Sequence, residues 1–363
     1  MTVSRAERAL IERADHMLGA ATRQVQLLGF ASPANFEAEL DRVGRCFARG
    51  EPCEPRFVYG GQPAFDQALA LALDEVAREL AGAGPLIELY SARARELALE
   101  AQLCLLTGAP AFGALAARRF EVAPALAAEA DALAAAWVAA PLPAATEAPD
   151  VISDDISDPR SLVRRLREVI GERRLPLRVM VARSLAPLAA IGEGVVQIAP
   201  SRVVHHEDVE RTVLHEIEGH ALPALRAERA PIGLFSIGTA RGSDTQEGFA
   251  LLLEDRAGFL GPKRKRELAL RHLAARAAHR GDAFHMAVQT LIVAGAPPAV
   301  ALRVAARAYR GGGLGREASY LPAFLEVRAA LADEPELEHA IAAGRVSVAA
   351  ARVLVAYPEL LPA

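Results

Sequence analysis

Most of this chain repeats one pattern, in which apolar residues recur at helical spacing with Arg and Glu between them. Apolar positions three and four residues apart lie on one face of an α-helix, so the pattern predicts amphipathic helices. The composition agrees, because alanine loses no side-chain entropy in a helix and is abundant here, while aromatic residues make up only 5%. The predicted helices are 4–30, 63–83, 88–106, 122–140 and 159–172, followed by a long apolar helix from about His206.

Short apolar runs of a different kind interrupt the helical pattern. Residues 177–182 and 194–199 are each predicted to form a strand, the second one closed by Pro200. The run 56–59 is a strand or an extended segment. With 363 residues, the chain is long enough for one large core or for two smaller ones. The expected fold class is therefore α+β, helix-rich, with a small sheet.

A cluster of prolines marks the best candidate for a domain boundary. Residues 141–158 contain three prolines and several acidic residues. A surface loop within a single domain would have the same composition, so both readings stay open. The predicted division is a helical N-terminal region at 1–140, a linker or surface loop at 141–158, and a second region at 159–363.

Charge and cysteine content exclude several classes of function. The net charge is −4 and shows no basic stripe, so neither nucleic acid nor a membrane is an expected partner. No stretch approaches the roughly 20 apolar residues of a membrane span. The first residues lead into charged helical sequence without an apolar signal core. The three cysteines, Cys46, Cys53 and Cys104, have no metal-ligand spacing and are expected to be reduced thiols. We therefore expect a cytoplasmic protein.

The segment with the most chemical information runs from His215 to His220 and continues at Glu247. A hydrolytic zinc site needs three N or O ligands, an open position for water, and a carboxylate that touches the water. His215 and His220 on one helix supply two ligands, Glu216 supplies the base, and Glu247 on a later helix supplies the third ligand. The expected cofactor is one Zn²⁺ per chain.

The spacing of the two histidines departs from the familiar zincin pattern, in which they are four residues apart. Five residues correspond to about 140° around an ideal helix, which would point the side chains apart. Chelation by both therefore requires local widening, most simply a π-bulge of the i→i+5 type. Gly219, directly before His220, is the position where the backbone takes that distortion most cheaply.

Interpretations without chemistry compete with the metal site. A histidine pair on an apolar helix is more often packed or hydrogen-bonded than metal-bound, and Glu216 also fits a solvated helix position. Glu247 fits the fourth position of a capping box that begins at Asp244. The surroundings favour the metal, because the residues near His220 and after Glu247 are strongly apolar, and a buried charged residue needs a partner.

The motif pair resembles a known family. His-Glu-Ile-x-x-His followed by Thr-Gln-Glu-Gly-Phe-Ala is similar to the family named for its Gln-Glu-Gly-Leu-Ala motif, long a domain of unknown function. That family includes the microtubule-associated tyrosine carboxypeptidases, zinc enzymes that remove a C-terminal tyrosine. Weaker similarity spans roughly residues 30–345 and includes 55–59, 309–312 and 320–321. Glu218-Gly219 and Phe249 depart from the usual residues, and Glu218 adds a negative charge near the metal.

The resemblance implies a zincin-like metallopeptidase whose catalytic region is 159–363. Carried over, it makes His215, His220 and Glu247 the metal ligands and Glu216 the general base. It also implies that the substrate is the C-terminus of a peptide or protein, with Tyr or Phe as the residue removed. Rival functions are an endopeptidase or amidase acting on a small peptide, including maturation of a ribosomal peptide product, and a non-catalytic zinc-binding regulator. An intact Glu216 speaks against the regulator.

Other residues have less certain roles. Arg310 is a candidate for binding the terminal carboxylate of the substrate, or else a surface arginine at a helix C-terminus. Tyr320 is a candidate oxyanion donor, or else a core tyrosine. Glu254 lies two turns after Glu247 and is placed to orient a zinc-binding histidine. We expect His205 and His206 to help cap the ligand helix. The predicted strand Val195–Ile198 is expected to be an edge strand that pairs with an extended peptide.

Overall fold

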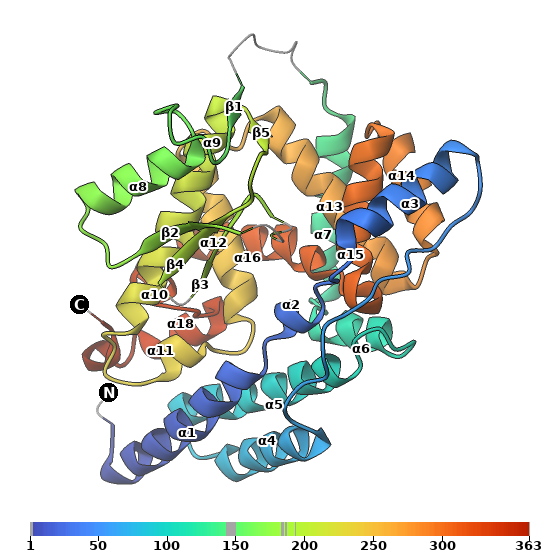
Figure 1. Cartoon of the computed structure of the whole chain (residues 1–363). Helices are drawn as coiled ribbons and strands as arrows, with labels where there is room; N and C mark the ends of the chain where they lie inside the picture. The colour runs from blue at the N-terminus through green and yellow to red at the C-terminus, as the bar shows by residue number, and fades with distance from the viewer. Residues whose placement is uncertain (1–2, 143–149, 183–184, 186, 193, 363) are drawn as a thin grey trace.

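The computed structural model describes residues 3–142, 150–182, 185, 187–192 and 194–362. Helices dominate, and two small sheets lie on one side of the molecule (Figure 1). The helix-rich α+β class is confirmed. The helices before the sheets are α1 (Arg5–Gln24), α2 (Leu27–Phe30), α3 (Phe36–Ala48), α4 (Gln67–Leu80), α5 (Pro85–Leu105), α6 (Phe112–Arg119), α7 (Pro124–Ala139) and α8 (Leu162–Glu172).

The predicted helices agree with the structure except for the first. A single helix was expected over 4–30, but the chain forms α1 and then the short α2. The start of α1 follows from local chemistry. The Ser4 side chain accepts from the Glu7 backbone N–H, and the Glu7 carboxylate accepts from the Ser4 N–H, which completes a capping box.

The strands form a two-stranded and a three-stranded sheet. In the first, β1 (Val151–Ile152) pairs antiparallel with β5 (Val203–Val204). In the second, β4 (Val195–Ile198) lies between β2 (Arg178–Val181), which is parallel to it, and β3 (Ala189–Gly192), which is antiparallel. The two predicted strands are confirmed. The expectation that 195–198 is an edge strand is wrong, because β4 has a partner on both sides. Near the third predicted run, Tyr59 forms only an isolated bridge with Pro33.

After the sheets, the rest of the chain is helical. After β5 the chain forms α9 (His206–Leu214), a π-helix η1 (His215–Ala221), α10 (Leu222–Ala227), α11 (Leu234–Ile237), α12 (Gly242–Arg256), α13 (Pro262–Arg280), α14 (Phe284–Val293) and α15 (Pro298–Gly313). The last elements are η2 (Arg316–Ser319), α16 (Tyr320–Asp333), α17 (Leu337–Ile341), α18 (Val348–Leu354) and η3 (Pro358–Leu360).

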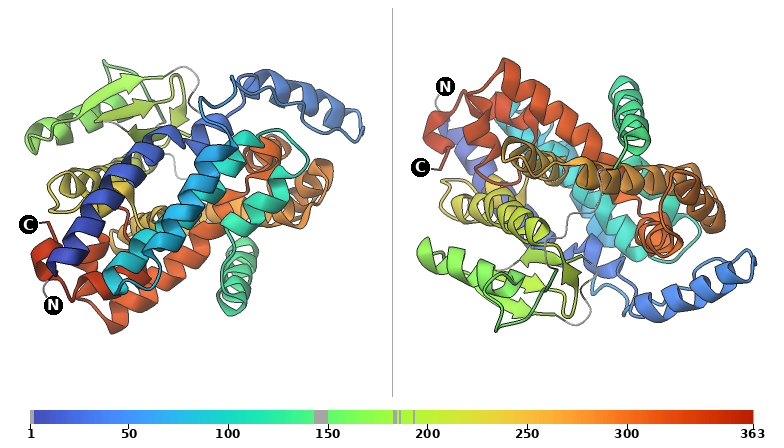
Figure 2. Two further views of the ribbon diagram at one scale, coloured as in Figure 1. Left: turned by 90° about the horizontal axis from the view of Figure 1, so that it is seen from below. Right: turned by 90° about the horizontal axis from the view of Figure 1, so that it is seen from above.

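The largest cluster of buried apolar side chains draws on both ends of the chain. It combines residues of α1, α4 and α5 with residues of α11, α12, α16 and α18. Figure 2 shows the two termini near each other on the same side of the molecule. A second cluster of buried apolar side chains joins both sheets to α8, α9 and η1. The predicted boundary at 141–158 includes residues 143–149, which lie outside the described residues, so the division into regions stays a prediction.

Among the described residues, no single helix combines the length and apolar composition of a membrane span. The helices Phe112–Arg119 and Pro124–Ala139 meet that test only together, across a 99° bend.

Candidate metal centre

The helix that carries both histidines changes its hydrogen-bonding pattern where they occur. The α-helix α9 ends at Leu214, and His215–Ala221 continue as the π-helix η1. The wider turn brings the rings of His215 and His220 together, with centroids 4.9 Å apart and Nε2 atoms 3.2 Å apart. The π-bulge predicted from the five-residue spacing is confirmed.

Two glycines allow the helices of the site to approach closely. A Cβ on Gly219 would lie 2.5 Å from the Cβ of Ala250 on α12, and one on Gly248 would lie 2.4 Å from the backbone of Ala323 on α16. Real side chains do not pack at such distances. Gly219 has helical backbone angles rather than a positive φ, so contact with α12 also explains this glycine.

Glu247 on α12 completes a group of three potential metal ligands. Its carboxylate oxygens lie 3.9 Å from Nε2 of His215 and 4.0 Å from Nε2 of His220. One donor atom from each of the three residues lies within 4.8 Å of the others. Two segments that are distant in the sequence thus bring two imidazole nitrogens and a carboxylate to one point. This group could hold a metal ion.

The other ring nitrogen of His215 has a buried partner. Nδ1 of His215 lies 2.7 Å from Oε1 of Glu254, which is fully buried. Arg264 on α13 donates two hydrogen bonds to the same carboxylate, at 2.8 and 2.9 Å. Although burial acts in the opposite direction, Arg264 holds the pKa of Glu254 well below its ordinary value. In a neutral His215 ring, an ionised Glu254 holds the proton on Nδ1 and leaves Nε2 free as a ligand. The predicted contact of Glu254 is confirmed.

Burial also shifts the pKa values of Glu216 and His220. It raises the pKa of the Glu216 carboxyl to about 7, although the neighbouring His215 opposes the shift. It lowers the pKa of His220 to about 4, so that imidazole is neutral at neutral pH. Glu216 is 7% exposed, which excludes the solvated helix glutamate that was its alternative.

The capping-box interpretation of Glu247 is wrong. The N-cap of α12 is Arg241, so Asp244 already lies within the first turn of the helix. The Asp244 carboxylate instead pairs with Arg119 of α6 at 3.2 Å, and it accepts a hydrogen bond from Ser319. His205 occupies the N-cap position of α9, but no side-chain cap hydrogen bond forms there. The prediction that these histidines cap the helix is therefore correct for the position of His205 but not for a capping hydrogen bond.

Tyr320 and Arg310 are both buried, Tyr320 at the start of α16 and Arg310 near the end of α15. Tyr320 begins α16 and is 6% exposed, and it belongs to the largest apolar cluster. Its ring lies 5.6 Å from the guanidinium carbon of Arg316. Arg310 is buried in the non-helical turn near the end of α15, with Nη2 3.8 Å from Oε1 of Glu317. The alternative of a surface arginine is wrong.

The structure adds two arginines that the sequence reasoning missed. Nη2 of Arg316 donates to Oε1 of Glu247 at 3.0 Å, and Arg264 pairs with Glu254. Arg316 precedes Tyr320 by four residues, so a helical turn through this segment is the signal that would have placed it near the site. Arg264 has no comparable signal, because its contact depends on where α13 begins relative to Glu254 on α12.

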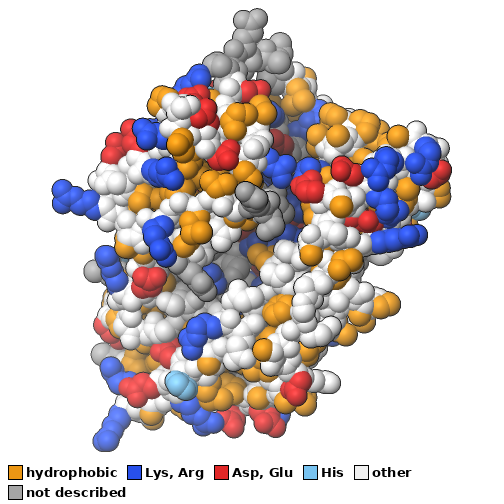
Figure 3. Space-filling view, viewed as in Figure 1, with side chains coloured by type: hydrophobic (Ala, Val, Ile, Leu, Met, Phe, Trp, Pro, Cys, Tyr) orange, Lys and Arg blue, Asp and Glu red, His pale blue; other side chains and the backbone are white. Residues whose placement is uncertain are grey.

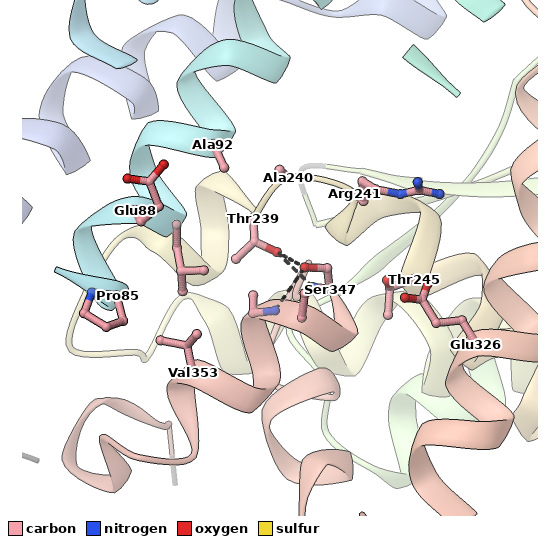
Figure 4. Close-up of a pocket in the computed structure, with 13 residues that line it drawn as sticks. Pro85, Glu88, Ala92, Thr239, Ala240, Arg241, Thr245, Glu326, Ser347 and Val353 are labelled. Atoms are coloured by element: carbon pink, nitrogen blue, oxygen red, sulfur yellow. Dashed lines mark hydrogen bonds between the residues drawn. The ribbon is translucent and has the colours of Figure 1, made fainter. Parts of the chain in front are cut away.

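The face shown in Figure 3 is hollowed near its middle, between the side that carries α8 and the side that carries α3, and arginine or lysine side chains are visible inside. A separate cavity of about 460 Å³ lies between α5, α12 and α18 (Figure 4). Thr239 and Ser347 on its wall hydrogen-bond to each other. Neither the two histidines nor Glu216 nor Glu247 lines it, so this cavity is not the candidate centre.

Comparison with known proteins gives one match. The family model described as microtubule-associated tyrosine carboxypeptidase matches residues 45–359, which is most of the chain and includes all the residues of the candidate centre. Searches for similar curated proteins and for similar solved structures gave no match. The matched description is that of a peptidase family, in agreement with the resemblance seen in the sequence. The chain therefore belongs to the microtubule-associated tyrosine carboxypeptidase family.

Proposed function

We propose that this protein is a zincin-like, zinc-dependent carboxypeptidase whose metal ligands are His215, His220 and Glu247. The observation that carries the proposal is the convergence of their donor atoms at one partly buried point. Ligands of a tetrahedral zinc with bonds of about 2.0–2.1 Å lie about 3.3 Å from one another. The 3.2 Å between the two Nε2 atoms fits that geometry, and the carboxylate at 3.9–4.0 Å is close to it.

In the proposed mechanism, zinc supplies Lewis acidity that lowers the pKa of water and polarises the scissile carbonyl. Glu216 takes a proton from the attacking water onto its carboxylate and delivers it to the leaving amine. One C–N bond breaks and one C–O bond forms, so water is consumed and the base is regenerated. Tyr320 and Arg316 are the proposed donors to the negative charge that develops on the carbonyl oxygen.

The free edge of β3 is the proposed place for an extended peptide, in place of β4. The backbone N–H of Ala199 donates to the carbonyl of Leu188 at 2.9 Å, directly opposite in the antiparallel register. Hydrogen-bonded and non-bonded pairs alternate along such a ladder. Ala189 and Ile191 therefore direct their N–H and C=O groups away from β4, and β3 contacts η1. A peptide paired there would run past the metal ligands.

We propose that the substrate is a peptide or protein C-terminus, with an aromatic residue removed. The family name, tyrosine carboxypeptidase, is the support for this preference. Arg310 is one candidate partner of the terminal carboxylate, although it shares the Glu317 carboxylate with Arg307. Cleavage of a panel of peptides with varied last residues, read by mass spectrometry, tests the proposal. Release of single C-terminal residues is expected, and internal cuts would instead indicate an endopeptidase.

Metal content is the first test. The purified protein is expected to carry about one zinc per chain, because three ligands with one open position are typical of catalytic zinc. Elemental analysis measures this directly. A protein without transition metal that takes up none when zinc is added would contradict the proposal.

Substitution of the base gives a second test with a matched control. Glu216→Gln preserves shape but removes the base, so turnover should fall by about 10² or more while zinc is retained. Glu218→Gln is the control, since Glu218 lies two residues away and its partly exposed side chain pairs with Arg173. Equal losses in both variants would show that the base lies elsewhere. His215→Ala should lose zinc and activity together.

A further inference from the structure

The wall of helices beside the candidate centre carries more cations than its carboxylates neutralise. Three arginines there have a carboxylate each: Arg264 pairs with Glu254, Arg307 with Glu317, and Arg316 with Glu247. Within the part of the chain that the structure describes, Arg271 on α13 makes no hydrogen bond and no ion pair. It is half-buried rather than fully exposed. A cation in such a place needs an anion from elsewhere.

Helix geometry places Arg271 on the side of α13 that faces the centre. It follows Arg264 by seven residues, which is almost two full turns, so both side chains leave the helix on the same stripe. One turn further along, the carbonyl of Ala275 lies against Gly315, at the start of the segment that bears Arg316. Arg271 therefore sits between the arginine that supports His215 and the one that contacts Glu247.

The electrostatic surroundings of Arg271 are unfavourable for a cation. Burial lowers the pKa of its guanidinium to about 10, and the charges of Arg307 and Arg264 act in the same direction. The carboxylates of Glu267 and Glu317 oppose the shift, but each of them is nearer to another arginine. Residues kept in place against such repulsion are characteristic of functional sites.

Arg310 is a less suitable partner for a ligand than Arg271. Its side chain is only 8% exposed, and it shares the Glu317 carboxylate with Arg307. Arg271 has greater exposure and shares no carboxylate, so its guanidinium fork is free for two parallel hydrogen bonds to an incoming carboxylate.

We propose that Arg271 binds a carboxylate of the substrate and thereby contributes to specificity. This inference rests on the proposed peptidase function, because it places the ligand in the same site. The carboxylate is either the free C-terminus or an acidic side chain of the peptide. Both sources offer the same planar anion, and separate arms of the experiment distinguish them.

The kinetic test compares matched peptides on the zinc-loaded enzyme. One pair differs only in a free or an amidated C-terminus, and a second pair carries Glu or Gln at the position before the cleaved residue. In Arg271→Gln, the preference for one of the charged peptides should fall by about tenfold or more, since the bond to a charged group is lost. Loss in the first pair identifies the terminus as the source, and loss in the second identifies the side chain.

Arg280→Gln is the matched control. Arg280 lies at the exposed end of the same helix and pairs only with Asp282 at the surface, so the change in net charge is identical. The control should keep both preferences. If Arg271→Gln also keeps both, or if the control loses them equally, the proposal is overturned.

A binding measurement separates this proposal from the proposed function. The melting temperature of the zinc-loaded protein is followed with 3-phenylpropionate and with the neutral 3-phenylpropionamide. The carboxylate should stabilise the native protein, and Arg271→Gln should lose most of that shift even if no peptide is cleaved. An unchanged shift would mean that the metal alone binds the anion and would overturn the role of Arg271.

The melting temperature of the ligand-free protein shows whether Arg271 has a structural role instead. Removal of a cation that has no partner and two cationic neighbours should not lower the melting temperature. A fall clearly larger than that of Arg280→Gln would show that Arg271 supports the fold, and would contradict the proposal.

Discussion

Helix α12 carries two groups of buried charge that differ in how completely they are paired. At its start, Asp244 joins Arg119, and that arginine also contacts Glu96 at 3.1 Å and Glu100 at 2.8 Å. Almost three turns of the helix lie between Asp244 and Glu254. At the candidate centre, by contrast, Glu247 and two histidines turn their donor atoms toward one another, and Arg316 lies 3.0 Å from the carboxylate.

The difference shows how the pairing of buried charges distinguishes a group that stabilises the fold from a candidate functional site. In the Arg119 group every charge meets an opposite charge, as a structural network requires. At the centre, the two imidazole nitrogens face each other at 3.2 Å, and the Glu247 carboxylate lies 3.9–4.0 Å from them. We interpret this convergence of potential ligand atoms as the place of the proposed metal ion. Substitutions in and around the two groups test this contrast, from the largest expected effect to the smallest.

Arg119→Met should destabilise the protein by about 3–5 kcal/mol, because it takes the closest cation from the buried Asp244 and leaves Glu96 and Glu100 with Arg93 alone. The midpoint of urea unfolding measures the effect. Arg13→Met is the matched control, since Arg13 pairs with Glu79 on the surface with 60% and 55% of the side chains exposed, and such pairs contribute about 0–1 kcal/mol. Equal small losses in both variants would break the contrast, because the Arg119 group would then not be structural.

Gly219→Ala should destabilise the protein by about 1–3 kcal/mol, because the new Cβ would overlap Ala250 and push η1 away from α12. Zinc affinity, measured by competition with a chelator, should fall together with stability. The double variant with Ala250→Gly restores the space and should recover much of both losses. If the second change gives no recovery, the close approach of the two helices is not the reason for this glycine.

Glu254→Gln should weaken zinc binding by about tenfold to a hundredfold, which is typical for loss of the partner that orients a ligand histidine. Glu267→Gln is the control: Glu267 also contacts Arg264, at 3.5 Å, but its side chain is 36% exposed and has no contact with His215. Chelator competition on both variants gives the comparison. Similar zinc affinities in the two would show that Glu254 serves only to neutralise Arg264.

The local chemistry of the centre could be predicted from sequence because it lies within two short segments. The five-residue interval between His215 and His220 requires the π-helix that the structure has, and the seven-residue interval from Glu247 to Glu254 places the second carboxylate on the same helix face. The strands at 178–181 and 195–198 were likewise marked by runs of β-branched residues.

The contacts that could not be predicted depend on residues with no local signal. Strand β3 consists of Ala189–Gly192, a composition with weak β-propensity, and without it β4 could not be recognised as a central strand. The contact of Arg316 with Glu247 spans 69 residues, and the pairing of Asp244 with Arg119 spans 125. Such contacts arise from packing of helices that the sequence pattern does not order in space.

The π-helix also has a consequence for how this site changes over evolutionary time. A π-turn equals an α-helix into which one residue has been inserted. Deleting one residue between Glu216 and His220 would bring the histidines to four-residue spacing, which an ordinary α-helix presents on one face. Every residue after the deletion would keep its orientation relative to those before it, because the wider turn already absorbs the extra residue. The metal ligands and the apolar face of α10 would both tolerate the deletion. The five-residue and four-residue spacings are therefore separated by a single step that leaves the packing of the helix after the histidines unchanged.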